Sequence, residues 1–318
     1  MAKSVAKRKP AKKIESPALI VEPPASRFTT AIKNAIGKLA PHHEQIIEQR
    51  APVTQTVQRA QERPKPKANN YIWTKIPGFD ALMENGIPEG NAIIIAGGAG
   101  SGKTIFCLQA LYEAAKLGKR CLYMSFEEST EKLMQHMRDF GWNPDPLIAD
   151  GKLIIQRFNP FDITRGVDAL LLRAKGELLI DIKPVLLPLD FKPDRVVVDS
   201  LTAIASAFAG KEDSYRIYIE QLFRFFEELG ATSFLITETK QIPTIFSTTG
   251  VEEFLADGVV VLYNIKRGNI RENAIEILKL RGAKHQKKIV AMQITDRGIE
   301  VFPEQEVFGD VDAKDDRS

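Results

Sequence analysis

The chain contains little cysteine and no long apolar run, and both absences narrow what it can be. Its 318 residues include two cysteines, Cys107 in a predicted helix and Cys121 at the start of a predicted strand, so neither a disulfide framework nor a cysteine-based metal site is expected. No apolar stretch approaches the ~20 residues that a membrane-spanning helix needs. The beginning of the sequence also lacks the apolar segment of a secretory signal. We therefore expect a cytoplasmic protein without a membrane span.

Acidic and aromatic residues are scarce in the first 70 residues. This stretch carries 14 Lys and Arg against 5 Glu and no Asp, one aromatic residue (Phe28) and 8 of the 18 prolines. Such a composition cannot bury enough apolar surface to offset the entropy lost on folding, so residues 1–70 are predicted to form a largely disordered basic arm. The arm is either a solvated linker or a contact for nucleic acid or a protein partner. Residues 304–318 are predicted to be an acidic tail.

Residues 71–303 contain the predicted folded domain. Apolar strands first alternate with amphipathic helices, which predicts an α/β fold with a mostly parallel, twisted sheet flanked by helices. From about Gly258 consecutive strands follow one another, so antiparallel strands are expected at the C-terminal end. A leucine-rich stretch at 176–193 has no function that its residues reveal. The predicted strands are 91–96, 120–126, 153–156, 195–198, 232–237, 259–265, 274–279, 289–294 and 300–302, and the predicted helices are 105–116, 131–140, 168–180 and 215–229.

Residues 97–104 match the phosphate-loop pattern G-x-x-x-x-G-K-[ST] between an apolar strand and a predicted helix. The glycines let backbone N–H groups approach phosphate oxygens, and the N-terminus of the following helix favours negative charge. The Lys103 ammonium can reach the β- and γ-phosphates, and the Thr104 hydroxyl can hold Mg²⁺. The sequence therefore predicts a bound nucleoside triphosphate, contacted by Gly98, Ala99, Gly100, Ser101, Gly102, Lys103, Thr104 and Ile105.

Three acidic residues follow predicted strands. Asp199 ends an apolar strand, which is typical of a carboxylate that holds Mg²⁺ directly or through water, although such an Asp can instead cap the next helix. Glu127 and Glu128 follow the strand 120–126, and ligands of open parallel sheets lie at the carboxyl ends of the strands. Glu127 is interpreted as the base that orients the attacking water. For Glu128, catalysis and stabilisation of the next helix both stay open.

The motifs occur in an order that carries a family resemblance. They are the phosphate loop and the segments 76–80, 86–90, 125–128, 198–200, 250–257, 276–282 and 294–299. Together they resemble the KaiC-like branch of the RecA superfamily over about residues 71–303. The resemblance implies a RecA-like fold and slow Mg²⁺-dependent hydrolysis of ATP. It also implies a ring of identical subunits, usually a hexamer, with ATP bound between neighbours. This chain has one such domain and the clock protein of the family has two, so a clock function does not follow.

The resemblance implies roles for four residues beyond the phosphate loop. Lys279 and Arg281 match a basic pair that reaches the γ-phosphate of the neighbouring subunit, which is the role of an arginine finger. Their alternation with leucines would equally suit a half-buried strand. His285 and Asp296 match positions near the bound nucleotide, and a solvated loop histidine remains an alternative for His285.

The leading hypothesis is a ring-forming Mg²⁺-dependent ATPase with a regulatory or signalling role. Its proposed catalytic residues are Glu127, Glu128, Lys103, Lys279 and Arg281, and its metal partners are Thr104 and Asp199. A first alternative is an assembly scaffold gated by nucleotide, with little turnover. A second is a DNA-binding protein related to recombinases, which would use the basic arm and the loops 203–213 and 240–250.

Overall fold

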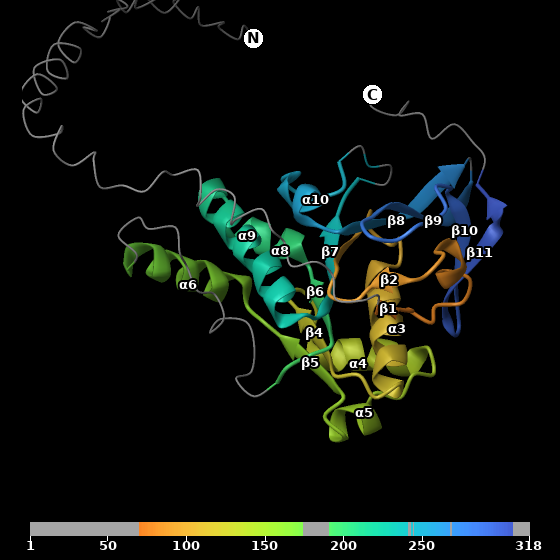
Figure 1. Cartoon of the computed structure of the whole chain (residues 1–318), viewed down its shortest axis with the longest axis horizontal. Coiled ribbons are helices and arrows are strands. Elements are labelled where there is room, and N and C mark those ends of the chain that lie inside the picture. The colour runs from red at the N-terminus through yellow and green to blue at the C-terminus, as the bar shows by residue number, and fades with distance from the viewer. Residues whose placement is uncertain (1–69, 174–190, 241–242, 244, 268, 308–318) are drawn as a thin grey trace, which may run out of the picture. The chain divides into compact units, whose positions relative to one another are not determined.

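The computed structural model describes residues 70–173, 191–240, 243, 245–267 and 269–307 (Figure 1). Nearly all of the predicted basic arm, most of the segment 176–193 and most of the acidic tail lie outside these residues. The predictions for those three stretches therefore stay predictions. The described part contains one large sheet with helices on both of its faces, and a smaller two-stranded sheet.

A nine-stranded mixed sheet forms the centre of this domain. Its strand order is β11-β10-β9-β8-β3-β7-β6-β4-β5. Neighbours from β5 to β8 in this order run parallel, and β8, β9, β10 and β11 pair antiparallel. This arrangement confirms the predicted α/β class with antiparallel strands at the C-terminal end. The strands are β3 (Ala92–Gly97), β4 (Cys121–Ser125), β5 (Leu153–Arg157), β6 (Arg195–Asp199), β7 (Thr232–Glu238), β8 (Gly258–Arg267), β9 (Ile270–Leu280), β10 (Val290–Thr295) and β11 (Gly298–Glu306), with β1 (Tyr71–Ile72) and β2 (Ile87–Pro88) as the separate pair.

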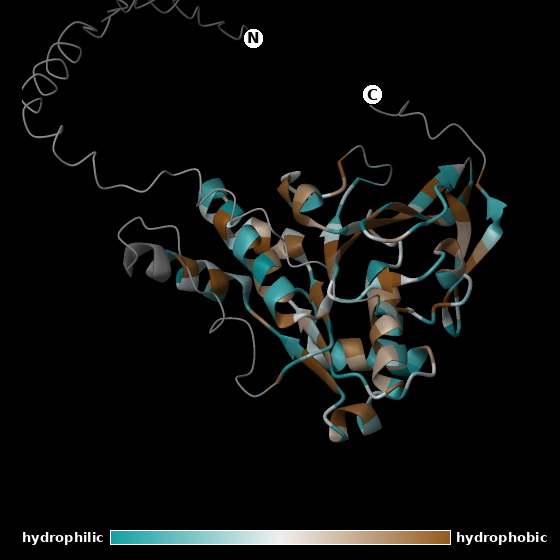
Figure 2. Cartoon of the chain, in the orientation of Figure 1, coloured by the Kyte–Doolittle hydropathy of each residue, from teal (hydrophilic) through white to brown (hydrophobic). Residues whose placement is uncertain are grey.

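Helices cover both faces of the sheet because the strands are apolar on both sides. In β3, Ile93 and Ile95 pack on one face and Ile94 on the other, and all three are fully buried. The first face carries α3 (Lys103–Lys116), α4 (Thr130–Asp139) and α5 (Asp145–Ala149). The second face carries α6 (Pro160–Arg173), α8 (Leu201–Ala207) and α9 (Glu212–Leu229). In Figure 2 many residues of the sheet are brown, which marks hydrophobic residues, and α9 carries many hydrophilic residues, drawn in teal.

The helix boundaries differ from the prediction where the helical pattern is short. The helix expected from 168 begins at Pro160, because the Asn159 side chain accepts a hydrogen bond from the Phe161 N–H at 3.1 Å and proline suits the first turn. Its predicted end at 180 lies outside the described residues. The short helices η2 (Asp80–Leu82), α5, α8 and α10 (Val251–Leu255) were not predicted, since three to seven residues are too few for a clear period.

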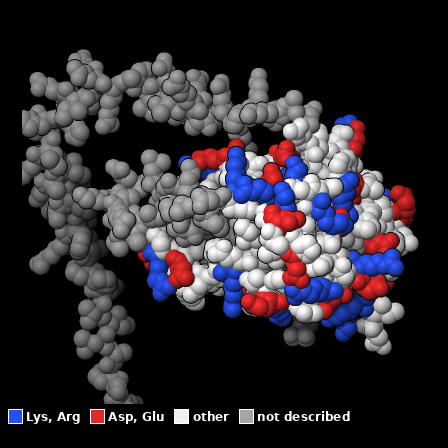
Figure 3. Space-filling model, turned by 90° about the horizontal axis from the view of Figure 1, so that it is seen from below, with Lys and Arg blue, Asp and Glu red and all other residues white. Residues whose placement is uncertain are grey.

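The charges on the surface are mixed. On the face drawn in Figure 3, blue Lys and Arg side chains and red Asp and Glu side chains are interspersed rather than gathered by sign. Within the described residues, no helix combines the length and the apolar character that crossing a bilayer requires. On the face drawn in Figure 3, the mixed charges form no surface of a single sign.

Candidate nucleotide-binding and catalytic site

The phosphate loop joins the end of β3 to the start of α3. Gly100 and Gly102 have φ angles of 73° and 96°, in the left-handed region that glycine adopts without steric cost. A Cβ atom at Gly97 would lie 2.4 Å from the Leu262 carbonyl oxygen and 2.5 Å from the Ser101 hydroxyl. The loop is therefore packed so closely against β8 that glycine is required at its first position.

The Lys103 ammonium lies across its own phosphate loop. Its Nζ donates a hydrogen bond to the Gly98 carbonyl oxygen at 3.0 Å, and the residue is buried. Burial lowers the pKa of Lys103, and the nearby carboxylates of Glu238, Asp199 and Glu127 partly oppose that shift. The ammonium is thus held at the loop by one backbone oxygen, which a phosphate oxygen can replace.

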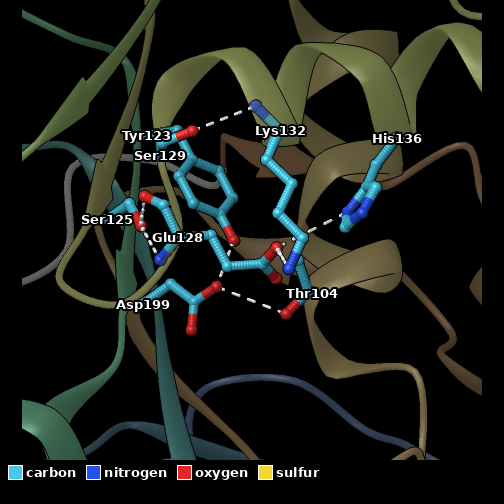
Figure 4. A network of polar contacts seen from close by, with 8 residues as sticks. All are labelled: Thr104, Tyr123, Ser125, Glu128, Ser129, Lys132, His136 and Asp199. Carbon is cyan, nitrogen blue, oxygen red and sulfur yellow. Dashed lines mark hydrogen bonds and ion pairs between the residues drawn. The ribbon is translucent and has the colours of Figure 1, made fainter.

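Asp199 stands at the end of β6, beside Ser125 at the end of β4. Its Oδ2 accepts hydrogen bonds from the Thr104 hydroxyl at 3.3 Å and from the Tyr123 phenol at 2.5 Å (Figure 4). Burial raises the pKa of Asp199 to about 6, and the charges of Glu127 and Glu128 add to that effect, whereas the two hydrogen bonds oppose it. The site thus concentrates negative charge around a buried carboxylate.

The pair Thr104 and Asp199 fits a bound Mg²⁺. A hydroxyl and a carboxylate are hard oxygen ligands, and Mg²⁺ at nucleotide sites takes few protein ligands beside phosphate oxygens and waters. In keeping with this, no cluster of three or more His, Cys, Asp or Glu side chains among the described residues is placed to hold a metal. The buried carboxylate is a group that a cation would stabilise.

Glu127 and Glu128 are adjacent in the chain but have different surroundings. The Glu127 side chain is exposed, and its Oε1 accepts a hydrogen bond from the Ser200 hydroxyl at 2.5 Å, next to Asp199. The Glu128 carboxylate forms an ion pair with Lys132 on α4 at 2.8 Å, and its backbone N–H donates to Ser125 (Figure 4). The Glu127 carboxylate thus bonds a residue next to Asp199, whereas the Glu128 carboxylate bonds a residue of α4.

Lys279 and Arg281 lie toward the ends of the strands that are opposite to the phosphate loop. The Lys279 Nζ donates to the carbonyl oxygens of Glu253 and Ala256, at 3.0 and 2.8 Å. The Arg281 guanidinium donates to the Phe254 carbonyl at 3.1 Å, and its backbone carbonyl accepts from the Asn91 side chain at 3.2 Å.

Asn91 precedes the first residue of β3, and the phosphate loop follows its last residue. At about 3.3 Å per residue, the two ends of β3 are separated by about 20 Å. We call the end with Gly97, Ser125, Asp199 and Glu238 the carboxyl edge, and the end with Asn91 and Arg281 the amino edge. The fold therefore does not bring the basic pair to the phosphate loop of its own subunit.

His285 and Asp296 divide between the same two regions. His285 pairs with Met83 in an isolated bridge, three residues after Gly282, which contacts β2. Both of its imidazole nitrogens are buried without a hydrogen-bond partner among the described residues. Asp296 is exposed in the turn between β10 and β11, whose Ile294 side chain approaches the phosphate loop at Gly102. His285 thus lies with the amino edge and Asp296 with the phosphate loop.

Three residues near the phosphate loop were not singled out from the sequence. They are Ser200, which bonds Glu127; Glu238, which influences Lys103; and Tyr123, which bonds Asp199. The only signal for Glu238 is its place after an apolar strand. For Tyr123 the signal is a polar hydroxyl within an otherwise apolar strand, next in space to the strand that ends in Asp199.

Comparisons with known proteins identify the family of the chain. The family model described as "ATPase: KaiC" matches residues 72–306. The circadian clock oscillator protein KaiC of Synechococcus elongatus is 32% identical over 72% of this chain, and the circadian clock protein KaiC3 of a Synechocystis species is 36% identical over 72%. The chain covers 44% and 45% of these two relatives.

A solved structure shows the same fold. It is a KaiC-like protein from the hyperthermophilic archaeon Pyrococcus horikoshii, with 30% identity and a TM-score of 0.60, and the match covers 74% of this chain and 99% of that one. The match to the family model over residues 72–306 and the identity to these relatives lead to one conclusion. This chain belongs to the KaiC family of RecA-like ATPases.

Proposed function

We propose that the chain hydrolyses Mg²⁺-bound ATP at a site that a neighbouring subunit completes. The observation that carries this proposal is that the two sets of residues lie toward opposite ends of the strands of one sheet. The phosphate loop, Glu127 and Asp199 lie at the carboxyl edge, whereas Lys279 and Arg281 lie at the amino edge. Arg281 bonds Asn91, the residue before β3, about 20 Å along the strand from the phosphate loop, so it can act on a γ-phosphate only from another copy of the chain.

Each residue at the carboxyl edge has a separate task in this proposal. The backbone N–H groups of the loop and the Lys103 ammonium bind the phosphates and stabilise the charge that develops on them. Thr104 and Asp199 hold the Mg²⁺, which when bound neutralises charge between the β- and γ-phosphates. The Glu127 carboxylate accepts a hydrogen bond from the attacking water and orients it, with Ser200 fixing the carboxylate.

The basic pair contributes from the neighbouring subunit. The half-exposed Arg281 guanidinium bonds the Phe254 carbonyl and lies 3.6 Å from the Asp257 carboxylate, so it would exchange these acceptors for a phosphate oxygen when a neighbour presents its nucleotide. Contact between an amino edge and a carboxyl edge is head-to-tail, and such contacts close into rings when the rotation fits. We propose a cytoplasmic hexameric ring, with slow turnover that passes a conformational signal to a partner.

The mass of the protein in solution tests this proposal. We expect an oligomer in the presence of Mg²⁺ and ATP, measured by light scattering after gel filtration of the full chain. A monomer both with and without nucleotide, combined with wild-type turnover, would overturn the intersubunit site. An oligomer that binds ATP but hydrolyses none would support the assembly scaffold instead.

The DNA-binding alternative would use the basic arm 1–70 together with the loops 203–213 and 240–250. On the face in Figure 3 the charges are mixed, whereas residues 1–70 carry 14 Lys and Arg against 5 Glu, so the arm is the part of the chain best suited by composition to bind phosphates. Binding of full-length protein to a DNA duplex across a salt series distinguishes the cases. Affinity that does not fall with salt, and that deletion of residues 1–70 leaves unchanged, would exclude this function.

A further inference from the structure

Tyr123 carries a hydroxyl at a place where packing alone requires only an aromatic ring. The residue lies within β4, between the sheet and the layer of α3 and α4, and its side chain is fully buried. A buried hydroxyl needs a hydrogen-bond partner, and this one donates to Asp199 Oδ2 (Figure 4). A phenylalanine would fill the same space without requiring an acceptor.

The register of the sheet places the phenol against the carboxylate. Tyr123 pairs with Val197 on β6, and Ser125 pairs with Asp199, so Tyr123 lies two residues before the carboxyl edge on the neighbouring strand. Tyr123 and Val197 face the α3 side, and alternation along β6 turns Asp199 to that side too. Such diagonal neighbours are within reach of a long aromatic side chain. The Tyr123 hydroxyl therefore reaches Asp199 along the face of the sheet that α3 covers.

The hydrogen bonds found for the Asp199 carboxylate in the described structure converge on one of its oxygens. Oδ2 accepts from Tyr123 at 2.5 Å and from Thr104 at 3.3 Å. Oδ1 is left as the oxygen available to a cation or to one of its waters. The shorter of the two bonds comes from a side chain that packing holds still, and Thr104 would itself be engaged by the metal.

We propose that Tyr123 is a positioning residue for the cation site, which holds Asp199 Oδ2 beside the Thr104 hydroxyl and so fixes the rotation of the carboxylate that leaves Oδ1 for the cation or one of its waters. The proposal rests on the proposed function of Asp199 as a magnesium partner. Groups that orient a metal-binding carboxylate typically change metal affinity 10- to 100-fold when removed. The expected consequence is a weaker metal site, with the nucleotide site otherwise intact.

The substitution Tyr123→Phe removes the hydroxyl and keeps the ring. We expect the Mg²⁺ concentration for half-maximal turnover to rise about tenfold, with kcat at saturating Mg²⁺ changed by less than about twofold. A second readout does not depend on turnover: binding of Mn²⁺ to the protein–ADP complex, followed by electron paramagnetic resonance, weakens by a similar factor. ADP binding without a divalent cation stays unchanged.

The matched control is Tyr263→Phe. Tyr263 is also a buried strand tyrosine, and its hydroxyl donates to the Glu276 carboxylate on β9, which is not part of the nucleotide site. We expect this variant to bind Mn²⁺ and respond to Mg²⁺ as the wild type does. Urea unfolding of both variants shows how much stability each lost hydroxyl contributes, so a general loss of stability cannot be mistaken for a metal effect.

Two outcomes separate this proposal from the function on which it rests. If Tyr123→Phe shows wild-type Mg²⁺ dependence and wild-type Mn²⁺ binding while Asp199→Asn loses both, the positioning role is wrong and the metal site stands. If Asp199→Asn itself leaves Mn²⁺ binding unchanged, the metal assignment is wrong, and the positioning role is wrong with it.

Discussion

The carboxyl and amino edges of the sheet carry the two halves of the proposed site, and the charged groups of the two edges have different surroundings. At the carboxyl edge, burial lowers the pKa of Lys103 and raises that of Asp199, so both groups are poorly solvated in the protein without ligand. At the amino edge, Lys279 and Arg281 bond the carbonyl oxygens at the end of α10. At the carboxyl edge the charged groups are buried, whereas at the amino edge both basic side chains already have hydrogen-bond acceptors.

The contacts at the amino edge give its two basic side chains hydrogen-bond acceptors within the same subunit. The free carbonyls at the C-terminal end of a helix favour cations, so the end of α10 can accept hydrogen bonds from two basic side chains. At the carboxyl edge the Lys103 ammonium lies near Asp199, and a bound cation would add a second counter-charge. We therefore expect substitution of the basic side chains at the amino edge to affect turnover, and substitutions at the carboxyl edge to affect turnover, binding or stability according to the residue.

The largest effect is expected at the amino edge. Arg281→Ala should lower ATP turnover at least about 1000-fold, because a finger arginine contributes 10³ to 10⁵ in rate. ATP binding, measured with a fluorescent analogue, should change by less than about tenfold, since the phosphate loop is intact. Arg216→Ala, which removes an exposed arginine paired with Glu220 on α9, is the control and should leave turnover unchanged. Turnover above a tenth of the wild-type rate in Arg281→Ala would contradict the proposed role.

A large effect on turnover is also expected from one of the two adjacent glutamates. Glu127→Gln should slow hydrolysis about 100-fold or more and leave ATP binding intact, because the amide cannot accept a proton from water. Glu128→Gln should cost less than about tenfold, since that carboxylate pairs with Lys132. Single-turnover assays on both variants measure this difference. Equal losses in the two variants would show that the hydrogen-bonding directions of these side chains do not determine their roles.

An intermediate effect is expected where the phosphate loop meets β8. Gly97→Ala places a Cβ 2.4 Å from the Leu262 carbonyl oxygen, and we expect a loss of about 3 kcal/mol in the free energy of unfolding and weakened ATP binding. Gly118→Ala is the control, because its Cβ would meet no atom within 4 Å and only its φ of 82° costs energy. Urea unfolding should show about 1 kcal/mol for that change. Similar losses at both positions would argue against the close packing of the loop.

The smallest effect concerns the support of α10. Glu252 is fully buried, and its carboxylate accepts a hydrogen bond from the Tyr215 hydroxyl at 2.6 Å. Tyr215→Phe should reduce the free energy of unfolding by about 1–3 kcal/mol, because a buried carboxylate loses a donor. Tyr71→Phe, which removes an exposed contact of 3.4 Å, should change it by less than about 0.5 kcal/mol. An unfolding curve for Tyr215→Phe that coincides with that of the wild type would show that Glu252 does not depend on this bond.

The parts of the site that are contiguous in sequence could be predicted from it. The phosphate loop, with Lys103 and Thr104, is defined by local spacing, and the apolar strands before Glu127 and Asp199 predicted that these carboxylates end strands. The sheet class followed from the change of pattern near Gly258. Each of these features depends on neighbours within about ten residues.

The parts of the site that depend on strand order could not be predicted. That β4 lies beside β6, with Tyr123 two residues before the level of Asp199, is decided by packing of the whole sheet. The contacts of Lys279 and Arg281 involve α10, a five-residue helix without a usable period. The separation of the edges likewise needs the β3–β8–β9 register, which no single segment encodes.

Mixing two inactive variants tests the intersubunit site most directly. Arg281→Ala subunits keep an intact carboxyl edge, and Glu127→Gln subunits keep an intact amino edge. If each site is shared between neighbours, an equal mixture forms some complete sites, and turnover should recover to about a quarter of the wild-type rate. If both residues act within one subunit, no mixture will exceed the average of the two variants measured separately, and the shared site would be wrong.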